Sequence, residues 1–124
     1  MSKRVIRVGI MSKEKMREYT IKIAKGEIKP AANAPKIFFP SLRAMAEALN
    51  DNSQALIEAI NQHHPESVKA LALLVNKDPG NVSRVLARLE QYGFVRMDKR
   101  EGKKDKQPIA LADKIEMQMS LVSN

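Results

Sequence analysis

The chain has 124 residues, 44% of them hydrophobic, which suits one domain with a real core and leaves no room for two. It contains no cysteine, which excludes disulfides, thiolate metal ligands and cysteine nucleophiles. No apolar stretch approaches the roughly 18 residues that span a bilayer, and the N-terminus lacks the apolar segment of a signal peptide. We therefore expect a cytoplasmic protein with no membrane partner.

The net charge of +8 is distributed unevenly along the chain. Residues 1–29 hold nine Lys/Arg against three Glu, and residues 94–106 hold six Lys/Arg against three acidic residues. Residues 41–75, in contrast, hold two basic and four acidic residues. Positive regions around a slightly acidic centre attract polyanions, most commonly nucleic acid, although solubility alone is an alternative explanation.

The N-terminal third predicts a strand, a helix and an extended arm. Apolar residues alternate with other residues over positions 3–10, which indicates a strand. Ser12 can cap a helix that runs to about Lys25. Residues 27–36 contain two prolines and no periodicity, which is typical of a linker or arm. The apolar residues 37–39 should then pack onto the core, which we favour over a binding role for the two phenylalanines.

Four helices are predicted between residues 41 and 93. The first follows Ser41 and is interrupted by the polar residues 50–53. The second starts there, where Asp51 and Gln54 resemble a capping pair, and it is stopped by Pro65. Ser67 can cap the third. Its apolar positions should form a buried face: Val68, Leu71, Ala72 and Val75.

The fourth helix, from Asp78 to Gly93, has both ends marked in the sequence. Asp78 can accept hydrogen bonds from the first free amides, Pro79 suits the first helical position, and Gly93 can end the helix. The apolar stripe is Val82, Leu86 and Leu89, with Val85 beside it. The opposite face carries short polar and cationic side chains: Asn81, Ser83, Arg84, Ala87, Arg88 and Gln91.

The C-terminal part predicts three strands. Residues 94–98 form the first, residues 99–106 a lysine-rich loop, and residues 107–111 the returning strand. Residues 115–121 alternate apolar and polar side chains, which indicates a third strand with one buried face.

Two short helices joined by about three residues, followed by a basic hairpin, match the spacing of a helix-turn-helix that reads duplex DNA. The exposed face of the fourth helix could then reach base edges in the major groove, with Asn81, Ser83, Arg84 and Arg88 as the candidates. Other donors could hold the phosphate backbone: Ser67, Lys69, Lys77, Arg100, Lys103, Lys104 and Lys106. The alternative is that Arg84 and Arg88 form a solvated face, paired with Glu90 or Glu58.

Residues 53–112 resemble a winged helix-turn-helix of the broad MarR-like kind. Four segments more specifically resemble a family of small prokaryotic transcriptional regulators: residues 34–42, 65–72, 81–86 and 92–95. The resemblance implies that the fourth helix is the recognition helix, in which Asn81, Ser83 and Arg84 match the family motif. It also implies an antitoxin that represses its own operon and binds a toxin protein. The turn at residues 76–79 departs from the family, in which Gly-Arg is expected.

The sequence does not favour an enzyme, and we expect no catalytic residues, metal or cofactor. The adjacent His63 and His64 would point about 100° apart on a helix, so they could not easily share a metal. Two further classes stay open, an RNA-binding module and a basic adaptor that neutralises a protein partner. RNA readers usually present aromatic side chains for stacking, and this chain has few.

We therefore predict a mainly α fold with a small β component (α+β), built on a winged helix-turn-helix over residues 41–112. Residues 1–26 add a strand and a helix, residues 27–40 an arm, and residues 113–124 a strand. The protein should be a homodimeric repressor of a double-stranded DNA operator. The terminal strands should form the dimer or dock a partner through Ile6, Val8, Ile10, Ile115, Met117, Met119 and Leu121.

Overall fold

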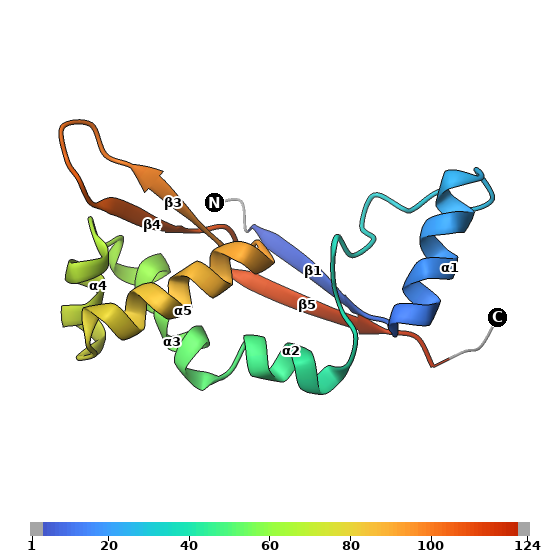
Figure 1. Ribbon diagram of the computed structural model, residues 1–124, viewed down its shortest axis with the longest axis horizontal. Helices are drawn as coiled ribbons and strands as arrows, with labels where there is room; N and C mark the ends of the chain where they lie inside the picture. Colours follow the sequence, from blue (N-terminus) through green and yellow to red (C-terminus); the bar gives the residue numbers. More distant parts are fainter. Residues whose placement is uncertain (1–3, 122–124) are drawn as a thin grey trace.

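The computed structural model describes residues 4–121 and shows an elongated molecule (Figure 1). It is a small α+β protein, as predicted, with five helices and five strands among these residues, where the sequence predicted five helices and four strands. Residues 1–3 and 122–124 of the predicted terminal elements lie outside the described part. The elements are β1 (Val5–Ile10), α1 (Lys13–Ala24), β2 (Ile37–Phe39), α2 (Leu42–Ala48), α3 (Asp51–His63), α4 (Val68–Val75), α5 (Pro79–Tyr92), β3 (Val95–Lys99), β4 (Lys106–Ala110) and β5 (Lys114–Met119). Helices α3, α4 and α5 gather at one end, α1 stands at the other, and a narrow sheet runs between them.

Each helix starts at a side chain that accepts a hydrogen bond from the backbone amide three residues further on. The four predicted caps are confirmed: Ser12, Ser41, Ser67 and Asp78. The prediction for α3 was wrong by one residue, because Asn50 is the cap, with its side chain 2.9 Å from the Ser53 amide. The Gln54 side chain instead donates to the carbonyl of Leu49 at 2.6 Å.

The predicted hairpin is present as an antiparallel pair in which Val95 lies opposite Ala110 and Lys99 lies opposite Lys106. Gly93 ends α5 with φ of 96°, a left-handed conformation that glycine adopts without strain. Phe94 and Val95 follow directly and are buried. The turn at Gly93 therefore sends the chain from α5 into β3 and fixes the hairpin beside the helices.

The sheet was only partly predicted. Its order is β2-β1-β5, and both outer strands run parallel to β1. Residues 37–39, expected only as an apolar segment, form the strand β2, with Val8 opposite Ile37. On the other side of β1, Val8 lies opposite Met117. Parallel pairing of the chain ends places the N-terminal strand in the middle of the sheet.

The two faces of this sheet differ in chemistry, because side chains alternate along each strand. One face carries apolar residues from all three strands and includes Val8, which is fully buried. On the other face, Arg7 pairs with Glu116 at 3.2 Å. There Phe38 lies over Gly9, so close that a Cβ on Gly9 would come within 2.6 Å of the Phe38 ring.

The core joins the apolar face of the sheet to the helices. Leu71 of α4 and Leu86 of α5 are at most 1% exposed, and Phe94 is 2% exposed. Phe39 of β2 lies 5.2 Å from Tyr92 and 6.4 Å from Phe94, measured between ring centroids, so it packs in the core as expected. Helix α1 is different, because it buries no residue and stands at the far end of the sheet (Figure 1).

Candidate nucleic-acid interface

Helix α5 has one buried and one exposed face. Val82, Leu86 and Leu89 are each at most 2% exposed, which confirms the predicted apolar stripe. The predicted base-contacting residues are all exposed: Asn81, Ser83, Arg84 and Arg88. The apolar stripe thus anchors the helix and leaves its polar face at the surface.

The exposed face concentrates cationic side chains around one hollow. Three cations and an amide line this hollow, which measures about 230 Å³: Lys77, Arg84, Arg88 and Asn81, with Asn52 and Val85 completing the lining. Asn52, at the start of α3, was not predicted, because its approach to α5 depends on tertiary packing. Lys77 was predicted for the phosphate backbone, and the fold brings it beside the predicted base contacts.

Arg84 is held in place by a neutral partner. Its Nη2 donates to the Oδ1 of Asn81, one turn earlier on α5, at 2.8 Å. Within residues 4–121 neither Arg84 nor Arg88 forms an ion pair, so the alternative pairing with Glu58 or Glu90 is not made. Both guanidinium charges therefore remain uncompensated on the exposed face.

The other predicted backbone contacts of the helical region differ in accessibility. Ser67 is only 9% exposed, and its hydroxyl accepts a hydrogen bond from the Ala70 amide at 3.0 Å. It therefore supports the start of α4 instead of presenting a donor at the surface. Lys69 in the first turn of α4 and Lys77 after its end are both exposed.

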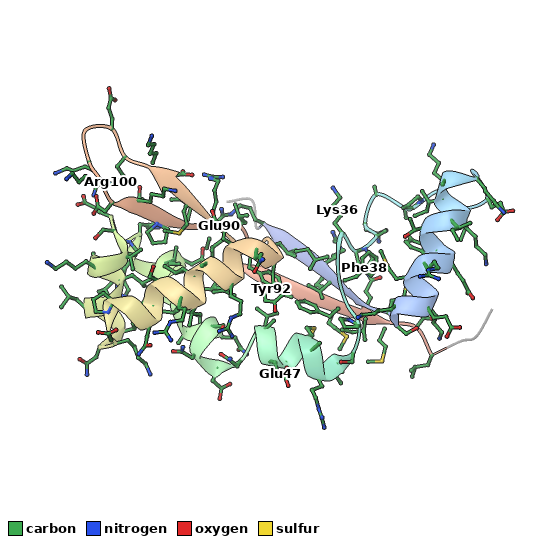
Figure 2. The ribbon with its side chains drawn as sticks, in the orientation of Figure 1. Lys36, Phe38, Glu47, Glu90, Tyr92 and Arg100 are labelled. Carbon is green, nitrogen blue, oxygen red and sulfur yellow. The ribbon has the colours of Figure 1, made fainter. Side chains whose placement is uncertain are left out.

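The β3–β4 loop carries exposed lysines and a restrained arginine. Lys103, Lys104 and Lys106 are exposed. The Arg100 side chain, labelled in Figure 2, is 25% exposed and lies 3.6 Å from a Glu66 oxygen and 3.7 Å from an Asp105 oxygen. Arg100 thus ties the hairpin to the segment before α4, and two carboxylates offset its charge.

A further ion pair lies on β3. The Nη2 of Arg96 is 3.0 Å from the Oδ2 of Asp98. This hydrogen bond and the positive charge of Arg96 lower the pKa of Asp98, and the same hydrogen bond and the negative charge of Asp98 raise the pKa of Arg96. Asp98 therefore stays ionised and neutralises Arg96, which leaves the loop lysines as the main positive charges of the hairpin.

The predicted dimer or partner residues fall into two groups. Val8 is buried within the chain, and Ile6, Ile10 and Ile115 pack against the core. Met117, Met119 and Leu121 are 44%, 39% and 89% exposed. Within the single chain, the predicted buried face of residues 115–121 is therefore present only at Ile115.

Two further features of the described residues limit the kinds of site present. Residues 4–121 contain no group of three or more His, Cys, Asp or Glu arranged to hold a metal ion. None of the described helices has the length and apolar character needed to cross a membrane.

These features define a small α+β protein with a cationic face on α5 and a lysine-rich hairpin that follows this helix in the chain. Residues 48–117 match the model of the HVO_A0114 family. The match covers more than half of the chain and runs from the end of α2 into β5, so the protein belongs to this family. No curated protein and no solved structure matches the chain.

Proposed function

We propose that this protein is a sequence-specific transcriptional regulator that binds double-stranded DNA through a winged helix-turn-helix. In this proposal α4 and α5 are the helix-turn-helix and the β3–β4 hairpin is the wing. One observation carries the proposal. Arg84 and Arg88 lie one turn apart on an exposed helix face, beside Lys77, and no carboxylate among residues 4–121 pairs with either arginine.

The chemistry of this face suits base reading in the major groove. An arginine can donate two hydrogen bonds to guanine, and an asparagine side chain can bind adenine. Because the Oδ1 of Asn81 already accepts from Arg84, the Nδ2 hydrogens of Asn81 remain available to an acceptor on DNA. The same hydrogen bond restrains the Arg84 side chain, which lowers the entropy lost when it binds.

The aromatic side chains favour duplex DNA over single-stranded RNA as the ligand. Single-strand readers stack bases on exposed rings. Here Phe94 is buried in the core, so it cannot stack on a base. Tyr92, at the end of α5, is 36% exposed, but its ring packs against Phe39 and Phe94, with centroids 5.2 Å and 6.3 Å away.

We further propose that the regulator is a dimeric repressor, and that it serves as the antitoxin of a neighbouring toxin gene. The repressor and antitoxin roles rest on the resemblance of its motifs to those of small prokaryotic regulators. A dimer would read two half-sites about one DNA turn apart, roughly 34 Å. The genes on either side of its own gene test the antitoxin role directly.

The proposed function is tested by comparing three ligands at two salt concentrations. The ligands are a duplex covering the DNA upstream of the protein's own gene, an unrelated duplex of equal length, and a single-stranded RNA. We expect the upstream duplex to bind at least about 10³-fold more tightly than the unrelated one. Equal binding to both duplexes, or tighter binding to the RNA, would contradict the proposal.

The loop lysines provide a separate prediction. Replacing Lys103 and Lys104 by alanine should weaken binding to all duplexes alike, because phosphates carry no sequence information. The logarithm of the binding constant decreases linearly with the logarithm of the salt concentration. If each lysine neutralises one phosphate, this decrease should become less steep by roughly two units of slope in the double variant. Titrations at several salt concentrations measure this slope. An unchanged slope would show that the wing does not contact phosphates. The control is Lys36→Ala, at an exposed lysine before β2, which should leave the slope unchanged.

A further inference from the structure

Strand β5 lies at an edge of the sheet. Its inner side pairs with β1 over six residues, and no described strand pairs with its outer side. Proteins usually protect such an edge with proline, a bulge or an inward-pointing charge. The apolar face of β5 has none of these, because its side chains are Ile115, Met117 and Met119. This edge is therefore open to another strand.

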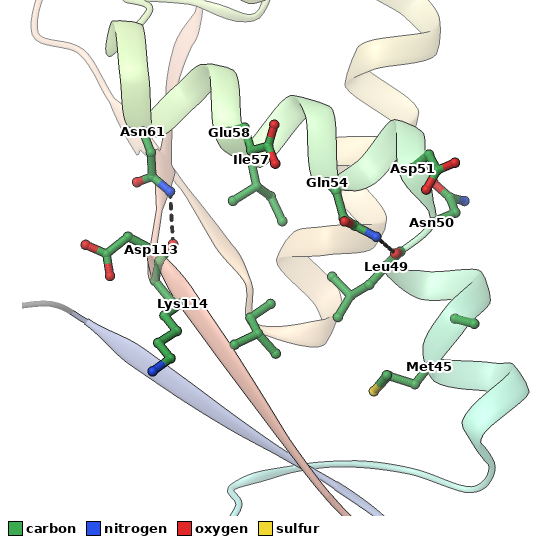
Figure 3. A pocket seen from close by; sticks show the side chains of 13 residues that line it. Met45, Leu49, Asn50, Asp51, Gln54, Ile57, Glu58, Asn61, Asp113 and Lys114 are labelled. Carbon is green, nitrogen blue, oxygen red and sulfur yellow. Dashed lines mark hydrogen bonds between the residues drawn. The ribbon is translucent and has the colours of Figure 1, made fainter.

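An apolar groove begins where β5 begins (Figure 3). It encloses about 490 Å³ between β5 and the helices α2 and α3. Its apolar lining comes from Met45, Leu49, Ile57 and Ile115. Met117 and Met119 lie on the same face of β5 as Ile115, so their exposed side chains extend this apolar surface along the strand.

The two ends of β5 differ in charge. At its start, the groove is bordered by three carboxylates, Asp51, Glu58 and Asp113, with Lys114 as the one base. At its other end stands α1, which carries five Lys/Arg and two Glu over residues 13–25. Residues of α1 and Ser120 line one shared hollow, so this helix is adjacent to the end of β5. Glu14 and Glu18 balance Lys15 and Lys22 within the hollow, and the net positive charge of the helix region comes from three exposed residues outside it, Lys13, Arg17 and Lys25. One end of the strand is thus acidic and the other is basic.

We propose that a second copy of this chain pairs with the β5 edge in antiparallel orientation, with Met117 opposite Met117 of the second copy. Antiparallel pairing brings the acidic end of each β5 beside the basic α1 of the other copy, so the opposite charges meet twice. A two-fold interface requires this kind of self-complementary surface. The charge pattern is what selects a second copy as the occupant.

The register follows from the side chains. With Met117 at the centre, Met119 lies opposite Ile115 of the second copy and Leu121 lies opposite Asp113 of the second copy. The exposed apolar side chains of each copy then extend over the groove of the other. Moving the centre to Glu116 would place two like charges directly opposite each other, which is destabilising. In the proposed register Glu116 instead faces the uncharged side chain of Gln118 of the second copy.

This interface deepens the proposed function by specifying the surfaces that form the dimer, and it is tested without DNA. Because the chain has no cysteine, a single introduced cysteine can cross-link only to the same position of another copy. Directly opposed residues have Cβ atoms about 4.5–5.5 Å apart, so Met117→Cys should form a disulfide-linked dimer on mild oxidation. In the same register two Leu121→Cys sites would lie about 26 Å apart and should not cross-link. Leu121 is the more exposed of the two residues, so random collisions would give the opposite result.

Disruption of the interface gives an independent measurement. The wild-type chain should sediment at twice the monomer mass, and Met117→Lys should sediment as a monomer, because two ammonium groups would meet at the centre. Leu73→Lys, a change at a 78% exposed leucine on α4, should remain dimeric. Circular dichroism confirms that each variant is folded. A monomeric wild type, a dimeric Met117→Lys, or equal cross-linking at positions 117 and 121 would overturn the interface. Specific binding to the upstream duplex is scored separately, so a failed interface and a failed function remain distinguishable.

Discussion

Replacement of Arg84 by alanine is expected to weaken binding to the preferred duplex by about 1–3 kcal/mol, which corresponds to about 5- to 150-fold in affinity. Arg84 is exposed, is not paired to a carboxylate, and is held by Asn81 in a fixed position. Loss of a bidentate contact to guanine removes discrimination at one base position and leaves the phosphate contacts intact. The variant should therefore bind unrelated duplexes almost as well as the wild type.

Two controls separate base reading from charge. Arg84→Lys keeps the positive charge but loses the planar donor pair, so it should retain non-specific binding and lose discrimination. Arg43→Ala removes another exposed arginine, which lies on α2 and does not line the cationic hollow, and should bind normally. Titrations of a duplex series with every base substituted at each position measure both effects. Normal affinity and normal discrimination for Arg84→Ala would show that α5 does not read bases through this residue.

The helices and hairpin could be predicted from the sequence because their signals are local. Ser67 and Asp78 each accept a hydrogen bond from an amide within the same helical turn. Gly93 ends α5 because it adopts the left-handed conformation that a helix end requires. The two faces of α5 follow from helical periodicity, which places Leu86 inside and Arg84 outside. Such features require no knowledge of distant residues.

The sheet depends on distant residues and could be predicted only in part. Strand β2 has three residues and exists because β1, more than 25 residues earlier in the chain, pairs with it. Alternation along residues 115–121 indicates which side chains share a face but not whether anything covers that face. Ile115 meets the core, whereas Met119 extends beyond it.

The candidate site shows the same division between local and distant signals. Composition and periodicity identify Arg84, Arg88 and the loop lysines as exposed cations. They cannot show that Arg100 is engaged by Glu66, which lies 34 positions earlier, or that Ser67 is buried, with only 9% of its surface exposed. A basic residue in a loop is available to a ligand only if no nearby carboxylate has already paired with it. That condition is set by the tertiary fold.

Replacement of Leu86 by alanine is expected to lower the free energy of unfolding by about 2–5 kcal/mol, because it removes a buried side chain and leaves a cavity. Leu86 is 1% exposed and belongs to the core that also contains Leu71 and Phe94. Small domains are stable by about 5–15 kcal/mol in total, so this change removes a large share of their stability. Urea unfolding followed by circular dichroism measures the difference.

Arg88→Ala is the matched control, because it lies half a turn from Leu86 on the exposed face of the same helix. It should change the free energy of unfolding by less than about 0.5 kcal/mol and yet weaken DNA binding. Leu86→Ala should lower the free energy of unfolding but leave DNA binding unchanged under conditions where the variant remains folded. Its side chain does not reach the surface that would bind DNA. This crossed result requires that one face of α5 holds the fold together and that the other binds DNA. If both variants lost stability and binding together, the two faces of α5 would not act separately.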